Sequence, residues 1–182
     1  MWPLNAPSVK GGPPRVHDSR RLRVAVEGLS VTMDTVMQIG DFVATANVRT
    51  VRRMLRALVE GDTVGGNAFV SPDFLDHDAP GADNSPPRRG SIQFRESVQW
   101  IHSVFAGLEF EEREVIAVND RVVVRGVMRG RHAGQFLGIA PTGRRVEVHQ
   151  VHIFRLTGDK VAEHRAMWGE FHLLLQLGAV LC

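Results

Sequence analysis

The stretch that decides the fold is RRVEVHQVHIFRLTGDKVAEHRAMWG, residues 144–169. Both of its halves are rich in β-branched residues, and polar residues alternate with apolar ones, as they do in half-buried strands. TGDK at 157–160 separates the halves, and its Gly158 can adopt the positive φ that a tight turn requires. The sequence therefore predicts an antiparallel hairpin.

The rest of the chain completes an α+β pattern around this hairpin. Two similar runs, residues 108–118 and 121–132, flank a turn at Asn119-Asp120. Apolar residues at three- and four-residue spacings predict helices over 48–60 and 91–106, and a last helix follows at 170–180. Residues 65–80 contain a short apolar segment and are expected to form a loop. Helices followed by an antiparallel meander imply a curved sheet that closes over helices.

The N-terminal region differs in composition. Residues 1–24 contain several Pro and Gly residues and five basic side chains against one acid, a net charge of +4. We expect a disordered basic tail there. Residues 25–47 form an extension whose scattered apolar positions are compatible with a helix. The remaining chain has a net charge of about −2 and no basic stripe, so we expect no nucleic-acid partner.

The apolar segments are too short for a membrane protein. The longest uncharged one near the end, FHLLLQLGAVLC at 171–182, cannot span a bilayer. No apolar segment follows the N-terminal basic residues, so we expect no signal peptide. The single cysteine, Cys182, cannot form an internal disulfide and fits a reducing compartment. These features predict a cytoplasmic protein without a membrane partner.

Five stretches together resemble a known family in their order and spacing. They are FLDHDAPG (74–81), GSIQFRESVQWIHSVFAGLEFEEREVIAVNDRVVVRG (90–126), HAGQFLGIAPTGRRVEV (132–148), HIFRLTGDKVAEH (152–164) and LLLQLGA (173–179). The combination is similar to the SnoaL-like polyketide cyclases, which share the cone-shaped fold of nuclear transport factor two. We therefore assign residues 48–182 to one SnoaL-like domain.

The resemblance implies a fold, a partner and a chemistry. The fold is a cone, in which a curved antiparallel sheet packs on three or more helices and encloses an apolar pocket. The partner is a second copy of the chain, bound through the sheet. The best-known members close a ring in a polycyclic polyketide by an intramolecular aldol reaction without a cofactor, and relatives of the same fold include epoxide hydrolases, ketosteroid isomerases and accessory hydroxylation components. A small hydrophobic ligand is therefore expected.

Three histidines are the candidate acid–base groups. The resemblance places His77 in the cavity, although a loop histidine paired with Asp76 or Asp78 is the simpler interpretation. It also places His152 beside the catalytic carboxylate. Alternate residues of a strand share a face, so residues 148, 150 and 154 would point into the cavity together with His152. The partner strand would turn the alternate set that contains His164 toward the same cavity. Because these histidines lack a local ligand motif, we expect no metal. Six residues are expected to line the pocket: Trp100, Phe105, Gln150, Phe154, Ala166 and Trp168.

The family's proton carrier is missing from this chain. The resemblance places its acid–base Asp at position 166 and a second Asp at 169, where this sequence has Ala166 and Gly169. Glu170 begins a helix, where the helix dipole alone explains an acid. A positioned acid–base group is worth about 100- to 10,000-fold in rate, and alanine cannot replace it. Two hypotheses remain: an acid–base enzyme that uses imidazoles on a polycyclic or isoprenoid substrate, or a non-catalytic binding or accessory protein.

Overall fold

The computed structural model describes residues 24–26, 29–31, 33–79 and 88–179. The chain divides into two units, residues 1–39 and 40–182. In the first unit, β1 (Val24–Val26) and β2 (Leu29–Val31) form an antiparallel pair. The tail predicted over residues 1–24 lies, apart from Val24, outside the described residues.

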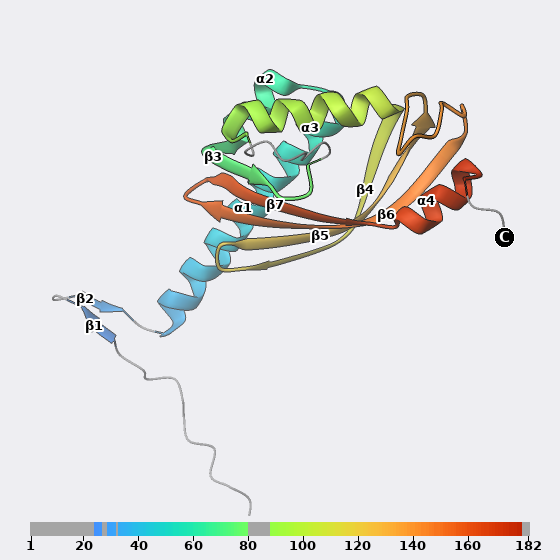
Figure 1. Cartoon of the computed structure of the whole chain (residues 1–182). Coiled ribbons are helices and arrows are strands. Elements are labelled where there is room, and N and C mark those ends of the chain that lie inside the picture. Colours follow the sequence, from blue (N-terminus) through green and yellow to red (C-terminus); the bar gives the residue numbers. More distant parts are fainter. Residues whose placement is uncertain (1–23, 27–28, 32, 80–87, 180–182) are drawn as a thin grey trace, which may run out of the picture. The chain divides into compact units, whose positions relative to one another are not determined.

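A curved five-stranded sheet with the strand order β3-β7-β6-β5-β4 dominates the second unit (Figure 1). Its strands are β3 (Val70–Asp76), β4 (Phe105–Val118), β5 (Arg121–His132), β6 (Arg145–Thr157) and β7 (Lys160–Trp168). The β4–β5, β5–β6 and β6–β7 pairs are antiparallel, but β3 runs parallel to β7. The α+β prediction is confirmed, and the sheet is mixed rather than wholly antiparallel.

Both predicted hairpin turns are present. Asn119, between β4 and β5, has a φ of 53°, and Gly158, between β6 and β7, has a φ of 61°. Asparagine and glycine tolerate this left-handed region better than other residues do. The turn at Gly158, together with a one-residue register shift between Arg155 and Leu156, places His152 opposite Ala166 and Phe154 opposite His164.

Helices pack on one face of the sheet. The helical elements are α1 (Met33–Glu60), the short α2 (Thr63–Gly66), the 3₁₀ turn η1 (Asn67–Phe69), α3 (Gly90–Val104) and α4 (Glu170–Leu177). The packing on the sheet involves the C-terminal part of α1, α3 and α4. The predicted helix over 48–60 is the C-terminal part of α1, whose N-terminal part lies in the region where we expected a possible helix. In Figure 1, α3 runs across the side of the sheet that holds β3 and β7, and α4 lies near the start of β6.

Two apolar clusters hold these layers together. The first joins Val51 and Met54 of α1 to Phe94 of α3 and to buried residues of the sheet such as Val124. The second joins the end of α3 to α4 through residues such as Leu173. Burial of such side chains contributes about 1.5–3 kcal/mol each. No helix in the described part of the chain has the length and apolar content that a membrane crossing requires.

The strand β3 was not predicted, because residues 65–80 were expected to form a loop. VSPDFLD contains Pro72 and two aspartates, which are uncommon in strands. β3 lies at the edge of the sheet, where a proline that cannot donate a hydrogen bond is tolerated. This strand brings Asp76 level with His164 of β7 and so decides the chemistry of the site.

Candidate functional site

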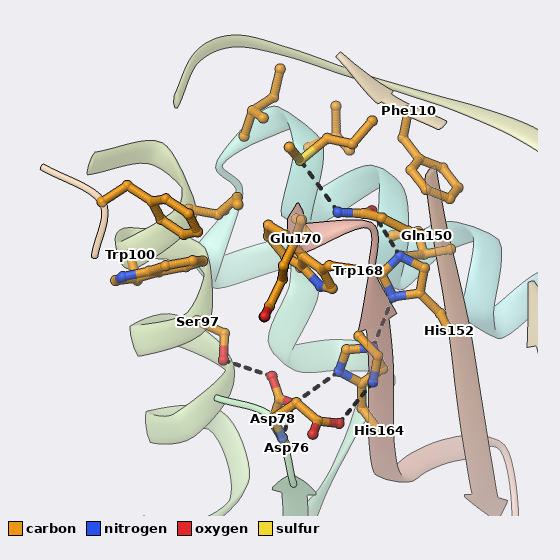
Figure 2. Close-up of a pocket in the computed structure, with 18 of the residues that line it drawn as sticks. Asp76, Asp78, Ser97, Trp100, Phe110, Gln150, His152, His164, Trp168 and Glu170 are labelled. Atoms are coloured by element: carbon orange, nitrogen blue, oxygen red, sulfur yellow. Dashed lines mark hydrogen bonds and ion pairs between the residues drawn. The ribbon is translucent and has the colours of Figure 1, made fainter. Parts of the chain in front are cut away.

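A cavity of about 330 Å³ lies between the concave face of the sheet and the helices. Trp100 of α3 and Trp168 of β7 form part of its wall, with ring centroids 5.9 Å apart. Further apolar residues of the wall are Leu55, Leu58, Val59, Ile101, Leu108, Phe110, Met128, Phe136, Leu137 and Ala166. Figure 2 shows the polar residues of the lining, which are Asp76, Asp78, Ser97, Gln150, His152, His164 and Glu170.

Two imidazoles face the cavity from adjacent strands. Alternation along β6 turns Gln150 and His152 toward the concave face, and both are buried. In the hairpin register, His152 and His164 are diagonal neighbours, which lie within reach of ring side chains. His152 Nδ1 is 3.0 Å from His164 Nε2, and the rings stack with centroids 5.3 Å apart.

A buried carboxylate completes this arrangement. Asp76 ends β3, and its Oδ1 is 3.0 Å from His164 Nδ1. Its Oδ2 accepts a hydrogen bond from Ser97 Oγ at 2.9 Å. The side chain of Gln93 binds the backbone nitrogen and oxygen of Asp76, at 2.8 and 3.0 Å, and so fixes the end of β3. Burial raises the pKa of Asp76, but the charge of His164 and these hydrogen bonds more than offset it, so the pKa lies below its ordinary value.

The hydrogen-bonded chain has a defined direction. Gln150 Nε2 lies 3.6 Å from Met128 Sδ, and a thioether sulfur can accept but not donate. Gln150 Oε1 therefore faces His152 Nε2, at 3.0 Å, and that nitrogen must donate. His152 Nδ1 then accepts from His164 Nε2. The remaining nitrogen of His164, Nδ1, faces Asp76 Oδ1 at 3.0 Å. We call Asp76, His164, His152 and Gln150 the relay (Figure 2).

Burial has a large effect on His152. Removal from water, and then the nearby charge of His164, lower the pKa of His152 to about 3, although Asp76 acts in the opposite direction. His152 is therefore a neutral imidazole near pH 7. A positive charge in the relay is more stable on His164, which contacts the Asp76 carboxylate directly, than on His152.

The structure places six of the nine predicted site residues around the cavity: Trp100, Gln150, His152, His164, Ala166 and Trp168. His77 is not among them, since its Nε2 contacts Glu163 Oε2 at 3.1 Å on the other face of β7. Phe105 is fully buried at the start of β4, against His132 and Phe136. Phe154 stacks behind the imidazoles, 4.9 Å from the centroid of His164, and supports them from the core.

The cavity has carboxylates that our sequence analysis did not assign to it. Asp76 and Asp78 line it from the end of β3, and Glu170 lines it from the start of α4. Asp78 Oδ2 accepts a hydrogen bond from the backbone nitrogen of Ala166 at 2.8 Å. The sequence signal was the alternation in FLDHDAP. If Phe74 points into the core, Asp76 shares its face and His77 points away.

Metal ligands do not gather at this site. Among the described residues, the His, Cys, Asp and Glu side chains form no group of three that could hold a metal ion.

Three comparisons relate the chain to known proteins. Residues 48–177 match the family model described as SnoaL-like polyketide cyclase. The aklanonic acid methyl ester cyclase AcmA of Streptomyces galilaeus is 31% identical over 121 residues, which cover 65% of this chain and 81% of that enzyme. The nogalonic acid methyl ester cyclase of Streptomyces nogalater is 31% identical over 129 residues, 69% of this chain and 92% of that enzyme. The structure of TsrD from Streptomyces laurentii superposes with a TM-score of 0.66 at 25% identity and covers 75% of this chain and 97% of TsrD.

Proposed function

The chain belongs to the SnoaL-like polyketide cyclase family, and from that premise we propose that it is an acid–base enzyme whose proton carrier is His152. The substrate would be a small, mostly apolar carbonyl compound bound in the cavity. The observation that supports this proposal is the unbroken hydrogen-bonded relay from Asp76 to His152 along the cavity wall. A base oriented by a second group, which is held in turn by a carboxylate, is the arrangement of many acid–base sites.

The proposed reaction is an intramolecular ring closure. A proton leaves a carbon next to a carbonyl group, the resulting enolate attacks a second carbonyl, and a proton is returned to the oxygen that becomes a hydroxyl group. One group that takes up the first proton and supplies the second suffices for this sequence. Position 166 carries no carboxylate, so we assign both steps to His152 Nε2. The substrate would reach this nitrogen at the position where Gln150 Oε1 now contacts it.

The relay explains how an imidazole with a low pKa could act as a base. In the state of the relay that acts as a base, His152 Nδ1 donates to His164 Nε2 and His164 Nδ1 donates to Asp76. His152 Nε2 is then free to accept a proton. A proton taken up at Nε2 is then followed by transfer of the Nδ1 proton to His164. The positive charge therefore ends beside Asp76 rather than on His152. When His152 Nε2 accepts, Gln150 must turn its amide so that its nitrogen faces His152, and it then gives up its contact with Met128 Sδ.

The relatives suggest the kind of substrate. AcmA and the Streptomyces nogalater enzyme are cyclases of aklanonic acid methyl ester and nogalonic acid methyl ester. The Trp100 and Trp168 rings, with Phe136 at 6.2 Å from Trp100, offer apolar faces on which a flat molecule could stack. We therefore propose a polyketide ester of this general type as the substrate.

A purified-enzyme assay tests the proposal. Aklanonic acid methyl ester and nogalonic acid methyl ester are incubated with the wild-type protein and with His152→Gln, and ring closure is followed by chromatography. We expect conversion by the wild type and a kcat about 100- to 10,000-fold lower for His152→Gln, with little change in KM. His149→Gln is the matched control, because His149 is exposed on the same strand. Full activity of His152→Gln would refute the assignment of the proton carrier.

The alternative is a binding protein without catalysis. It is favoured by the absence of a carboxylate at Ala166. It is also favoured by the hydrogen bond between His152 Nε2 and Gln150, because a nitrogen held in this way does not face a substrate. Ala166 lies opposite His152 across the hairpin, so Ala166→Asp places a carboxylate beside the imidazole. Ring closure by this variant but not by the wild type would show a competent pocket that lacks an acid. If both proteins bind the esters and neither converts them, the binding alternative is correct.

We also infer a homodimer that forms through the convex face of the sheet. On this face Val123 lies opposite Ile153, and Val151 lies opposite Met167, which is 65% exposed. These four residues form a contiguous apolar patch of the kind that dimer interfaces bury. Light scattering should give a dimer for the wild type and a monomer for Val151→Asp, and a monomeric wild type would contradict the inference.

A further inference from the structure

Apart from its two histidines, the ionisable side chains that line the cavity are all acidic. Asp76, Asp78 and Glu170 line it, and none of the lysine and arginine residues in the described part of the chain does so. The whole sequence has 22 lysine and arginine residues against 20 acids, so the bias belongs to the cavity and not to the protein. A ligand with a carboxylate would meet no cation there.

Two of these carboxylates are not neutralised. Asp76 contacts His164 Nδ1 through Oδ1 and accepts a hydrogen bond from Ser97 through Oδ2. Asp78 accepts only the backbone nitrogen of Ala166 through its side chain, and its other oxygen has no partner among the described residues. Glu170 forms no salt bridge within the part of the chain that the structure describes. Asp78 and Glu170 are both exposed to solvent, so they place carboxylates without a cationic partner among the described residues at the solvent-facing rim of the cavity.

Aromatic rings share the cavity with these carboxylates. Trp100 and Trp168 line it together with Asp78 and Glu170 (Figure 2). The indole is the ring that attracts a cation most strongly through its face, and aromatic walls with nearby carboxylates are how proteins bind organic ammonium groups. Trp100 also contacts Phe136, which extends the aromatic wall.

We propose that the polyketide ester bound in this cavity also carries a protonated amine, which is bound by Asp78, Glu170 and the faces of Trp100 and Trp168. Its flat apolar body lies against the remaining wall, toward the relay. The inference rests on the proposed function in that it concerns the same cavity, but it does not require that the ligand be converted. It adds that the cavity rejects molecules with a free carboxylate.

Each carboxylate also has a simpler role. Glu170 lies in the first turn of α4, where the helix dipole favours an acid. Asp78 holds the backbone of β7 at Ala166. These roles predict an effect on stability only. They do not predict that the affinity for a ligand depends on the sign of the ligand's charge, so charge selectivity separates the two explanations.

The test uses three probes that share one flat ring system: 2-(aminomethyl)anthracene, methyl anthracene-2-carboxylate and anthracene-2-carboxylate. Dissociation constants are measured at pH 7.5 by quenching of tryptophan fluorescence, since two of the three tryptophans line the cavity. We expect the amine to bind at least about tenfold more tightly than the ester, and the ester about tenfold more tightly than the carboxylate. An amine that binds no better than the ester, or binding of none of the probes, would refute the inference.

The variants Glu170→Gln and Asp78→Asn locate the effect. Each should reduce the preference for the amine over the ester about three- to tenfold and leave the affinity for the ester within about twofold. The Asn side chain keeps an oxygen for the Ala166 backbone. Glu109→Gln is the control, because Glu109 is exposed on β4 and does not line the cavity. An unchanged preference in both variants would refute the assignment of the ammonium site. Because these are binding measurements, an inactive protein that prefers the amine would refute the proposed catalysis and leave this inference intact.

Discussion

Two imidazole–carboxylate pairs connect the same two strands on opposite faces of the sheet. The inner pair is His164 with Asp76, 3.0 Å apart, and the outer pair is His77 with Glu163, 3.1 Å apart. Each strand contributes one acid and one imidazole in adjacent positions, and alternation sends them to opposite sides. The side chains of the inner pair are 10% and 9% exposed, and those of the outer pair 23% and 37%. The contacts are of similar length, so the main difference between the pairs is burial, together with the Arg155 contact to Glu163 in the outer pair.

The largest expected difference between the pairs is in stability. Asp76→Ala breaks a buried pair and leaves His164 without its partner, which we expect to cost about 3–5 kcal/mol of unfolding free energy. Glu163→Ala affects a partly exposed group and should cost at most about 1 kcal/mol. Urea unfolding followed by circular dichroism measures both. Equal losses would mean that burial does not distinguish the pairs.

The pH dependence of stability should come from the buried residues on the cavity side of the sheet. The pKa of His152 is lowered from 6.5 to about 3 by folding, so below pH 6.5 the unfolded chain binds a proton that the folded protein does not. Stability should therefore fall by up to about 1.4 kcal/mol for each pH unit, or about 2–3 kcal/mol between pH 6.5 and 4.5. Asp76, whose pKa is lowered by folding, adds to stability above its ordinary value and loses that contribution only at lower pH.

The variant His152→Gln should remove most of this slope. His149→Gln, on the exposed side of the same strand, should keep it. Urea unfolding of the three proteins at half-unit pH steps measures the difference. A His152→Gln slope equal to that of the wild type would show that another group titrates in this range.

The sequence allowed us to predict the elements whose signals are local. Alternation and a glycine turn identified β6 and β7, and the helical spacing of apolar residues identified α3. The same alternation predicted the inward faces of Gln150, His152 and His164. The stretches quoted for the family resemblance were sufficient, since the family model matches residues 48–177.

The missed features depend on contacts that are distant in the sequence. β3 is poor in strand-forming residues and forms because β7 supplies hydrogen bonds to it, and Asp76 lies 88 positions from its partner His164 in the sequence. Without that strand, the sides to which Asp76 and His77 point could not be known, and His77 was placed in the cavity. Phe154 points to the same face of β6 as His152, but it packs behind the two imidazoles. Alternation cannot distinguish residues of a cavity wall from those of the layer beneath it.

The smallest expected effect is the response of the two pairs to salt. Double-mutant cycles with alanine at both positions give the coupling energy of each pair, measured at pH 6 in 0.05 M and 1 M NaCl. For the outer pair we expect a coupling of about 0.2–1 kcal/mol that mostly disappears at 1 M salt, because exposed charges are screened. Arg155 also binds Glu163, at 2.6 Å, and competes with His77 for it, which makes the coupling smaller still. The coupling of the inner pair should persist, because ions do not reach a contact between side chains that are about nine-tenths buried. A salt-sensitive inner pair would mean that water and ions enter the relay, and the proposed transfer of charge from His152 to His164 would then lose its electrostatic basis.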